Sequence, residues 1–203
     1  MTTRIRPEEG STAQQILDVA ERLVQHQGFN GFSYADIAAE MNLTKPALHY
    51  HFSSKAELGE ALITRYTARF TDALDAIDAG EVGAPAKLEG YTALYLDVLR
   101  NKRMCLCGML AAEYQTLSPP MRRAVLDFFN RNEAWLAGIL DEGRSEGEIG
   151  FEGPPGEKAQ MIVGTLEGAM LVARPHDDIS RFEAVARRLV HELVVHPAGT
   201  AAG

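Results

Sequence analysis

The 203-residue sequence is poor in the features that mark secreted and membrane proteins. It holds only two cysteines, Cys105 and Cys107, which are too few and too close together for a stabilising disulfide framework. No stretch approaches the roughly 20 consecutive apolar residues of a membrane span, and the charged residues 1–10 have no apolar run behind them. We therefore expect a cytoplasmic protein that has no membrane partner.

Short motifs of several enzyme classes are also missing. The sequence contains no G-x-x-x-x-G-K, no G-x-G-x-x-G and no H-E-x-x-H, so it lacks the usual phosphate-binding, dinucleotide-binding and zinc-protease patterns. The single Cys-x-Cys has no second pair of ligands at zinc spacing. We expect no enzyme, no metal and no cofactor.

Positive charge is scarce. The formal net charge is −8, and residues 1–60 carry five basic against eight acidic side chains. Such a balance repels polyanions over long distances. If this chain binds nucleic acid, local geometry must provide the contact.

The sequence is rich in helical periodicity. Apolar residues recur at three- and four-residue steps with no sustained alternation, which predicts an all-α fold of nine helices. Capping residues, glycines and prolines mark where the helices start and stop. The predicted helices begin at Thr12, Tyr34, Thr44, Ser54, Pro85, Cys107, Pro119, Ala159 and Ser180.

Residues 33–52 have the pattern of a helix-turn-helix. Ile37, Ala38 and Leu48 can hold two short helices together, and Asn42 suits the left-handed position of the turn between them. Polar side chains such as Lys45 fall on the opposite face, beside the start of the second helix. The free backbone N–H groups at such a start favour phosphate.

The residues that follow make the pattern specific. Residues 48–58 read Leu-His-Tyr-His-Phe-Ser-Ser-Lys-Ala-Glu-Leu, which resembles the TetR-family pattern Leu-Tyr-x-His-Phe running into x-Ser-Lys-x-x-Leu. His49 stands where the family usually has tyrosine, and Asn42 replaces the usual turn glycine. The DNA-binding set implied by the resemblance is Ser33, Tyr34, Thr44, Lys45, His49, Tyr50, His51 and Lys55.

The resemblance also implies an architecture and a function. It predicts a nine-helix TetR-type fold with a three-helix DNA-binding domain at 1–53, an effector-binding and dimerisation domain at 54–196, and a disordered tail at 197–203. The implied protein is a transcriptional regulator, with repression as the family default. Its implied partners are palindromic double-stranded operator DNA, a second copy of itself and a small-molecule effector that releases the DNA.

The C-terminal part supplies candidates for the two remaining roles. Glu113 is the one charged candidate for contact with an effector. A carboxylate among apolar neighbours is costly to bury unpaired, so it needs a specific partner unless it faces water. The candidate effector residues are Tyr91, Tyr95, Met104, Met109, Glu113, Tyr114, Phe128, Phe129 and Trp135. The candidate dimer residues are Leu166, Met170, Phe182, Leu189 and Leu193.

Two alternatives stay open from the sequence. Cys105 and Cys107 follow Lys102 and Arg103 at a predicted helix start, where positive charge and the helix dipole lower a thiol pKa. The regulator could therefore sense oxidants or electrophiles through a thiol. The other alternative is a helical interaction module that binds no DNA, which would leave the polar face of residues 44–55 without a purpose.

Overall fold

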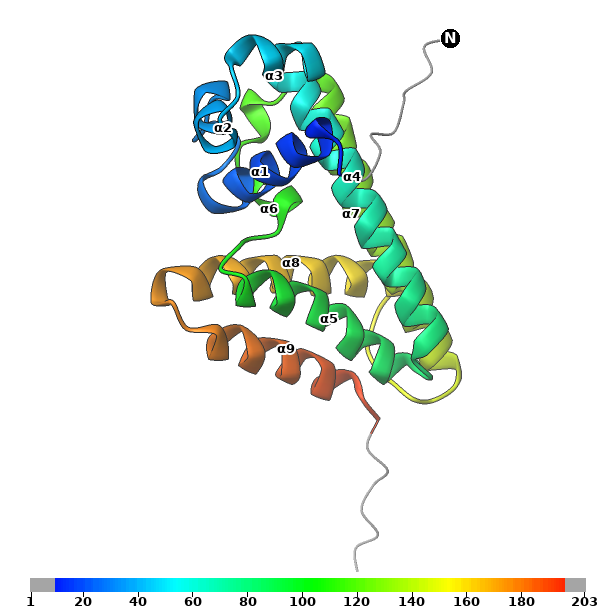
Figure 1. Cartoon of the computed structure of the whole chain (residues 1–203). Coiled ribbons are helices and arrows are strands. Elements are labelled where there is room, and N and C mark those ends of the chain that lie inside the picture. Colours follow the sequence, from blue (N-terminus) through cyan, green and yellow to red (C-terminus); the bar gives the residue numbers. More distant parts are fainter. Residues whose placement is uncertain (1–9, 196–203) are drawn as a thin grey trace, which may run out of the picture. The chain divides into compact units, whose positions relative to one another are not determined.

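The computed structural model describes residues 10–195, and helices account for most of them (Figure 1). The α-helices are α1 (Thr12–Gln27), α2 (Tyr34–Met41), α3 (Lys45–His51), α4 (Lys55–Gly80), α5 (Ala84–Arg100), α6 (Leu106–Ala112), α7 (Pro119–Ser145), α8 (Pro155–Ala173) and α9 (Ile179–Leu193). Two short 3-10 helices, η1 (Tyr114–Thr116) and η2 (Arg174–His176), follow α6 and α8. The prediction of an all-α fold with nine α-helices is confirmed for these residues, whereas the predicted tail at 197–203 lies outside them.

Some helix ends differ from the prediction. Ser11 rather than Thr12 caps α1, because its hydroxyl accepts a hydrogen bond from the Gln14 N–H. The helix predicted from residue 107 to residue 117 begins at Leu106 and breaks at Glu113 into η1. Helix α8 begins four residues before the predicted Ala159, since a proline fits the first turn of a helix without losing a hydrogen bond.

The chain folds as two compact units. Unit 1 comprises the residues up to Arg69 together with Arg103–Leu126, and unit 2 comprises Phe70–Lys102 together with the residues from Asp127 onward. Helices α4 and α7 each contribute residues to both units. The predicted boundary after residue 53 divides the chain by role and stays a prediction.

Unit 1 surrounds the helix-turn-helix with packed helices. Ion pairs join α1 to α4, because the nearly buried carboxylate of Glu21 binds Arg65 at 2.6 Å and also binds Arg69. Helices α4 and α7 approach closely at Gly59, where a Cβ atom would lie 2.5 Å from the Met121 side chain. The helices before and after α2 and α3 are therefore fixed to one another.

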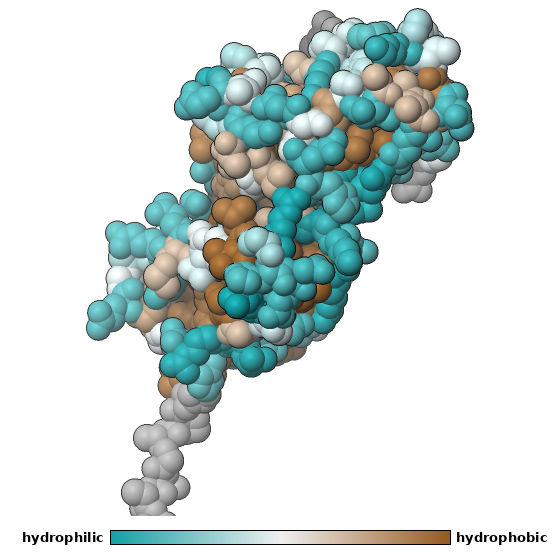
Figure 2. Space-filling model, turned by 90° about the vertical axis from the view of Figure 1, so that its left-hand side faces the viewer, coloured by the Kyte–Doolittle hydropathy of each residue, from teal (hydrophilic) through white to brown (hydrophobic). Residues whose placement is uncertain are grey.

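Unit 2 is built around three neighbouring helices. Helices α5, α8 and α9 lie side by side (Figure 1) and bury apolar side chains among them. Hydrophilic residues cover most of the surface drawn in Figure 2, with hydrophobic residues exposed between them. Among residues 10–195, no helix is both long enough and apolar enough to cross a membrane.

Candidate functional site

The helix-turn-helix is shaped by local hydrogen bonds. Ser33 and Asp36 form a capping box at the start of α2, in which the Asp36 carboxylate accepts the Ser33 N–H at 2.7 Å. These bonds to Ser33 lower the pKa of the exposed Asp36 carboxyl. Asn42 adopts the left-handed conformation (φ 53°, ψ 37°) that turns the chain between the helices. The predicted turn and its capping residues are confirmed.

The start of α3 is organised in the same way. The Thr44 hydroxyl accepts the Ala47 N–H at 3.3 Å, and Pro46 lies in the first helical turn. Leu48 is buried against α2 together with Ile37, as the sequence predicted. Thr44 therefore has a structural task as the N-cap of α3, in addition to the DNA contact predicted for it.

An exposed polar face remains on α3. Lys45, His49 and Tyr50 are all exposed, and Tyr50 keeps 87% of its surface accessible. His49 Nδ1 lies 3.1 Å from the Ser53 carbonyl oxygen, which orients the imidazole. The half-buried ring of His51 lies edge-on to Tyr50, with 5.3 Å between the ring centroids. The structure thus brings four of the predicted DNA-binding side chains onto α3.

The hydroxyl group of Tyr34 points into the fold. Its hydroxyl donates to the Phe52 carbonyl oxygen at 2.9 Å. Burial, and secondarily the negative charge of Glu57, raise the pKa of the Tyr34 hydroxyl to about 12. The hydroxyl is thus engaged in joining α2 to the end of α3, a role that the sequence did not indicate.

Lys55 is also placed differently from the sequence-based expectation. Its ammonium donates to the main-chain carbonyl oxygens of Phe29 and Phe32, and it lies over both phenyl rings. The side chain is half-buried, and this burial lowers the pKa of its ammonium group. In this structure Lys55 therefore binds the turn between α1 and α2, and the phosphate contact predicted for it stays a prediction.

The nine predicted effector residues fall into two groups. Met104, Met109, Glu113 and Tyr114 belong to unit 1, whereas the other five belong to unit 2. The Glu113 carboxylate accepts the N–H groups of Phe29 and Asn30. Tyr114 lies under the guanidinium of Arg122 at the surface. The structure thus gives Glu113 two main-chain partners, and the ligand contact suggested by the sequence stays a prediction.

The five unit 2 candidates form one aromatic cluster. Tyr91 and Tyr95 are fully buried, and their hydroxyl oxygens lie 3.1 Å apart. The Trp135 ring stacks on Tyr91 at 5.7 Å, and its indole N–H donates to Asp78 at 2.8 Å. Phe128 completes the buried part and contacts Phe129. The structure thus brings these five predicted residues together, and their contact with an effector stays a prediction.

Two further members of the cluster were missed. Asn132 is buried and accepts the Tyr91 hydroxyl at 3.1 Å, while its own amide donates to the Phe128 carbonyl. Phe70 packs edge-on against Tyr91, Tyr95 and Phe128. The sequence signal for Asn132 is an asparagine four residues after Phe128, on the apolar face of a helix.

Both cysteines are buried. Cys105 is the N-cap of α6, where its sulfur accepts the Gly108 N–H at 3.5 Å and the Tyr66 hydroxyl at 3.7 Å. Cys107 lies within α6 and exposes none of its surface. The predicted position near a helix start is confirmed.

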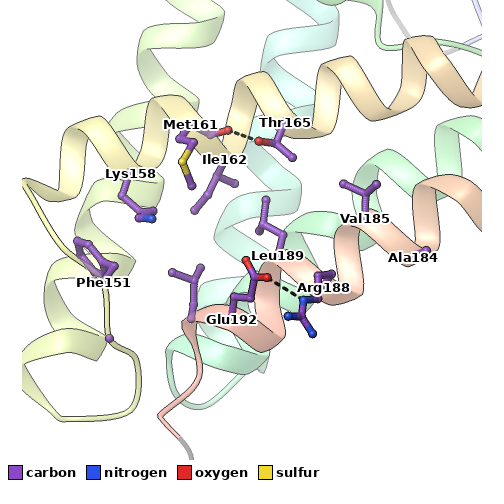
Figure 3. A pocket seen from close by; sticks show the side chains of 12 residues that line it. Phe151, Lys158, Met161, Ile162, Thr165, Ala184, Val185, Arg188, Leu189 and Glu192 are labelled. Carbon is purple, nitrogen blue, oxygen red and sulfur yellow. Dashed lines mark hydrogen bonds and ion pairs between the residues drawn. The ribbon is translucent and has the colours of Figure 1, made fainter.

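The candidate dimer residues divide between core and surface. Leu166, Met170, Phe182 and Leu193 are buried within unit 2, so they are core residues of the chain itself. Leu189 is half-buried and, together with Leu193, lines a groove of about 610 Å³ between α8 and α9 (Figure 3). The exposed apolar residues of these two helices are Met161, Leu171, Val172 and Val185.

A serine motif in unit 2 bears on the expectation that the chain is not an enzyme. Residues 143–147 read Gly-Arg-Ser-Glu-Gly, which matches the nucleophile pattern G-x-S-x-G. That pattern functions on a sharp turn between a strand and a helix, whereas Ser145 is the last residue of α7 and donates to the Glu142 carbonyl. The geometry therefore does not present Ser145 as a nucleophile.

Comparison with known proteins agrees with this geometry. The model of "Bacterial regulatory proteins, tetR family" matches residues 16–62, and that of "Tetracyclin repressor-like, C-terminal domain" matches residues 84–189, more than half of the chain. The chain is 27% identical to the HTH-type transcriptional repressor NemR of Escherichia coli K12, over 94% of this chain and 97% of that one. It is 28% identical to the HTH-type transcriptional regulator TtgR of Pseudomonas putida, over 75% and 77%.

A solved structure agrees over nearly the whole chain. A TetR-family transcriptional regulator from Agrobacterium tumefaciens superposes with a TM-score of 0.87 at 27% identity, covering 90% of this chain and 97% of that one. Both family models, the curated relatives and this structure point to the same group of proteins. The chain is a member of the TetR family of bacterial transcriptional regulators.

Proposed function

We propose that this regulator is a repressor that binds a palindromic operator as a homodimer and leaves it when a small-molecule effector binds. It acts where bacterial DNA lies, in the cytoplasm, and the proposal requires no catalytic activity. The observation that carries it is the exposed polar face of α3, with Lys45, His49 and Tyr50 beside the capped start of the helix. An exposed recognition helix of this kind enters the major groove with its N-terminal end.

A gel-shift titration tests the DNA-binding part of the proposal. The probe is the DNA upstream of the protein's own gene, and a shuffled sequence of equal length is the control. We expect a complex with the first probe that weakens steeply as salt is raised, because phosphate contacts release counterions. Equal binding to both probes would contradict a specific operator in this DNA, and no binding at low salt would support the alternative of a helical interaction module.

The α8–α9 groove supports a dimer through these helices. Thr165 and Leu189 line it, while Gly164 and Gly168 of α8 have open space where a side chain would project. Exposed Met161 and Val185 add apolar area at the same two helices. A two-fold axis here pairs each helix with its own copy and sets the two recognition helices about 34 Å apart on the DNA.

The aromatic cluster is the proposed effector site. Its members Tyr91, Tyr95 and Asn132 place three hydrogen-bonding side chains among packed aromatic rings, a composition typical of ligand sites. Trp135 reports on the cluster through its fluorescence. Titration with candidate aromatic ligands should change Trp135 emission and operator affinity at the same concentrations. A ligand that changes the emission but leaves the affinity unchanged would contradict the proposal for that ligand.

One observation favours a thiol-sensing regulator as the second candidate. The Cys105 sulfur accepts two hydrogen bonds, from the Gly108 N–H at the start of α6 and from the Tyr66 hydroxyl. The same two donors could bind a thiolate sulfur, which is the reactive form of cysteine. Treatment with an alkylating agent, followed by the gel shift, separates this candidate from the first: only a thiol sensor releases the operator without a ligand.

A further inference from the structure

The turn between α1 and α2 is held by a distant carboxylate. Glu113, the C-cap of α6, accepts the Phe29 N–H at 2.6 Å and lies 3.3 Å from the Asn30 N–H through both of its oxygens. Successive N–H groups that converge in a turn form an anion-binding concavity. Here the anion belongs to the protein itself, 84 residues further along the chain.

Gly28 leaves the space that this contact requires. Its φ of +84° is a conformation that other residues rarely adopt. A Cβ atom at Gly28 would lie 2.7 Å from Glu113 Oε1. The turn is thus shaped to receive this carboxylate at close range, and a side chain at position 28 would expel it.

Lys55 binds the carbonyl groups of the same turn. Its ammonium binds the carbonyl oxygens of Phe29 and Phe32, and it lies 4.7 Å and 4.2 Å from the two ring centroids. The negative charges of Glu113 and Asp36 partly oppose the lowering of the Lys55 pKa by burial. An anion on the N–H groups and a cation on the carbonyl groups therefore restrain one short turn.

The segment that carries Glu113 is attached to α1 and the turn at two more points. The Met104 N–H donates to the Gln25 carbonyl at 3.3 Å, and the Asn30 side-chain amide donates to the Thr116 hydroxyl at 2.7 Å. Ser33, which caps α2, follows the turn directly. A shift of the Glu113 segment would therefore pull on the residues that position α2.

We propose that Glu113 is a positioning residue for DNA recognition. It clamps the α1–α2 turn so that α2 and α3 keep the geometry that reads the operator. Release of the clamp lowers the fraction of molecules in this geometry and raises the apparent dissociation constant in proportion. This inference rests on the proposed function, because it assumes that α3 binds an operator.

Two substitutions at Glu113 test the clamp. Glu113→Ala removes both acceptors, and we expect operator affinity to fall about tenfold, within the range of usual coupling energies. Glu113→Gln keeps one acceptor oxygen without the charge, so its affinity should lie between those of Glu113→Ala and the wild type. Glu157→Gln, an exposed glutamate in the first turn of α8, is the matched control and should bind as the wild type does.

A second readout tests the clamp without DNA. In an NMR spectrum of the dimer, the amide protons of Phe29 and Asn30 should move upfield in Glu113→Gln and further upfield in Glu113→Ala, because a carboxylate is the stronger acceptor. Lys55→Met should reduce the effect of Glu113→Ala on operator affinity, since both residues restrain the same turn. Circular dichroism and size-exclusion chromatography confirm that each variant is folded and dimeric.

The outcomes separate the two proposals. A folded Glu113→Ala dimer that binds the operator as tightly as the wild type would overturn the clamp and leave the proposed function standing. A wild-type protein that binds no operator would overturn the proposed function, and this inference with it. If Glu113→Ala fails to fold, the comparison of Glu113→Gln with Glu157→Gln decides, because a purely structural role changes thermal stability without changing the affinity of the folded dimer.

Discussion

The hydroxyl of Tyr34 donates a hydrogen bond of 2.9 Å to the main-chain carbonyl oxygen of Phe52. Tyr34 is the first residue of α2 and Phe52 is the C-cap of α3, so this bond ties the outer ends of the helix-turn-helix together. The Tyr34 ring also packs against His49, with 4.8 Å between centroids. The angle between the two helices therefore depends on one phenolic hydroxyl as well as on the apolar core.

Tyr34→Phe should loosen this unit without unfolding it. The change keeps the ring but leaves the Phe52 carbonyl without its donor, so we expect a loss of about 1 kcal/mol in the free energy of unfolding. Operator affinity should fall as well, because the recognition helix is less well held. Urea denaturation and gel shift measure the two effects. Tyr50→Phe is the control: its ring is 87% exposed, and its stability should equal that of the wild type.

The same hydroxyl predicts a pH dependence. The pKa of Tyr34 is raised from 10.0 to about 12 in the folded protein. The stabilisation is thus fully present below pH 10 and is lost as pH rises toward 12, because the unfolded chain gives up this proton first. Wild type should lose more stability than Tyr34→Phe over this range in urea denaturation series. Parallel curves for the two proteins would show that the hydroxyl does not contribute.

The local parts of the fold could be read from the sequence because their causes are local. A helix cap is formed by a hydroxyl or carboxylate and a backbone N–H only a few residues away. This local pattern identified the caps formed by Ser33 with Asp36 and by Thr44. Asn42 marked the left-handed turn for the same reason. The start of α8 at Pro155 was missed because the surrounding glycines and prolines also favour a loop.

The long-range parts could not be read in this way. Nothing near Glu113 in the sequence indicates that its partners are the N–H groups of Phe29 and Asn30. The candidate dimer residues divide between core and surface for a different reason. Helix α9 has apolar residues on two faces, and periodicity does not say which face is core: the structure buries Phe182 and Leu193 but leaves Val185 partly exposed.

Lys45 should contribute one phosphate contact. It is exposed at the first position of α3, where a lysine can reach the DNA backbone. Lys45→Gln should weaken binding to all sequences alike and reduce the slope of log affinity against log salt by about one. Lys102→Gln, an exposed lysine in the loop after α5, should leave the slope unchanged. An unaltered slope in Lys45→Gln would place this side chain away from phosphate.

Exposed and buried apolar residues of α8 and α9 should respond differently to the introduction of a charge. Val185→Asp places a carboxylate on the partly exposed face, so we expect a folded monomer with little change in circular dichroism. Leu166→Asp buries a carboxylate in the core of unit 2 and should unfold the chain. Analytical ultracentrifugation gives the oligomeric state. A Val185→Asp protein that remains dimeric would place the interface on another surface.

The two thiols should react slowly in the folded protein. Cys105 is 2% exposed and Cys107 is fully buried, so an alkylating agent reaches them only when the structure opens. Wild type should consume N-ethylmaleimide far faster in urea than in buffer. Cys107→Ala isolates Cys105, which sits at the N-cap of α6 and accepts the Tyr66 hydroxyl. If this variant reacts rapidly in buffer and then releases its operator, the regulator responds to thiol chemistry rather than to a ligand in the aromatic cluster. If Cys105 reacts slowly and the operator stays bound, the release signal is a ligand rather than a modified thiol.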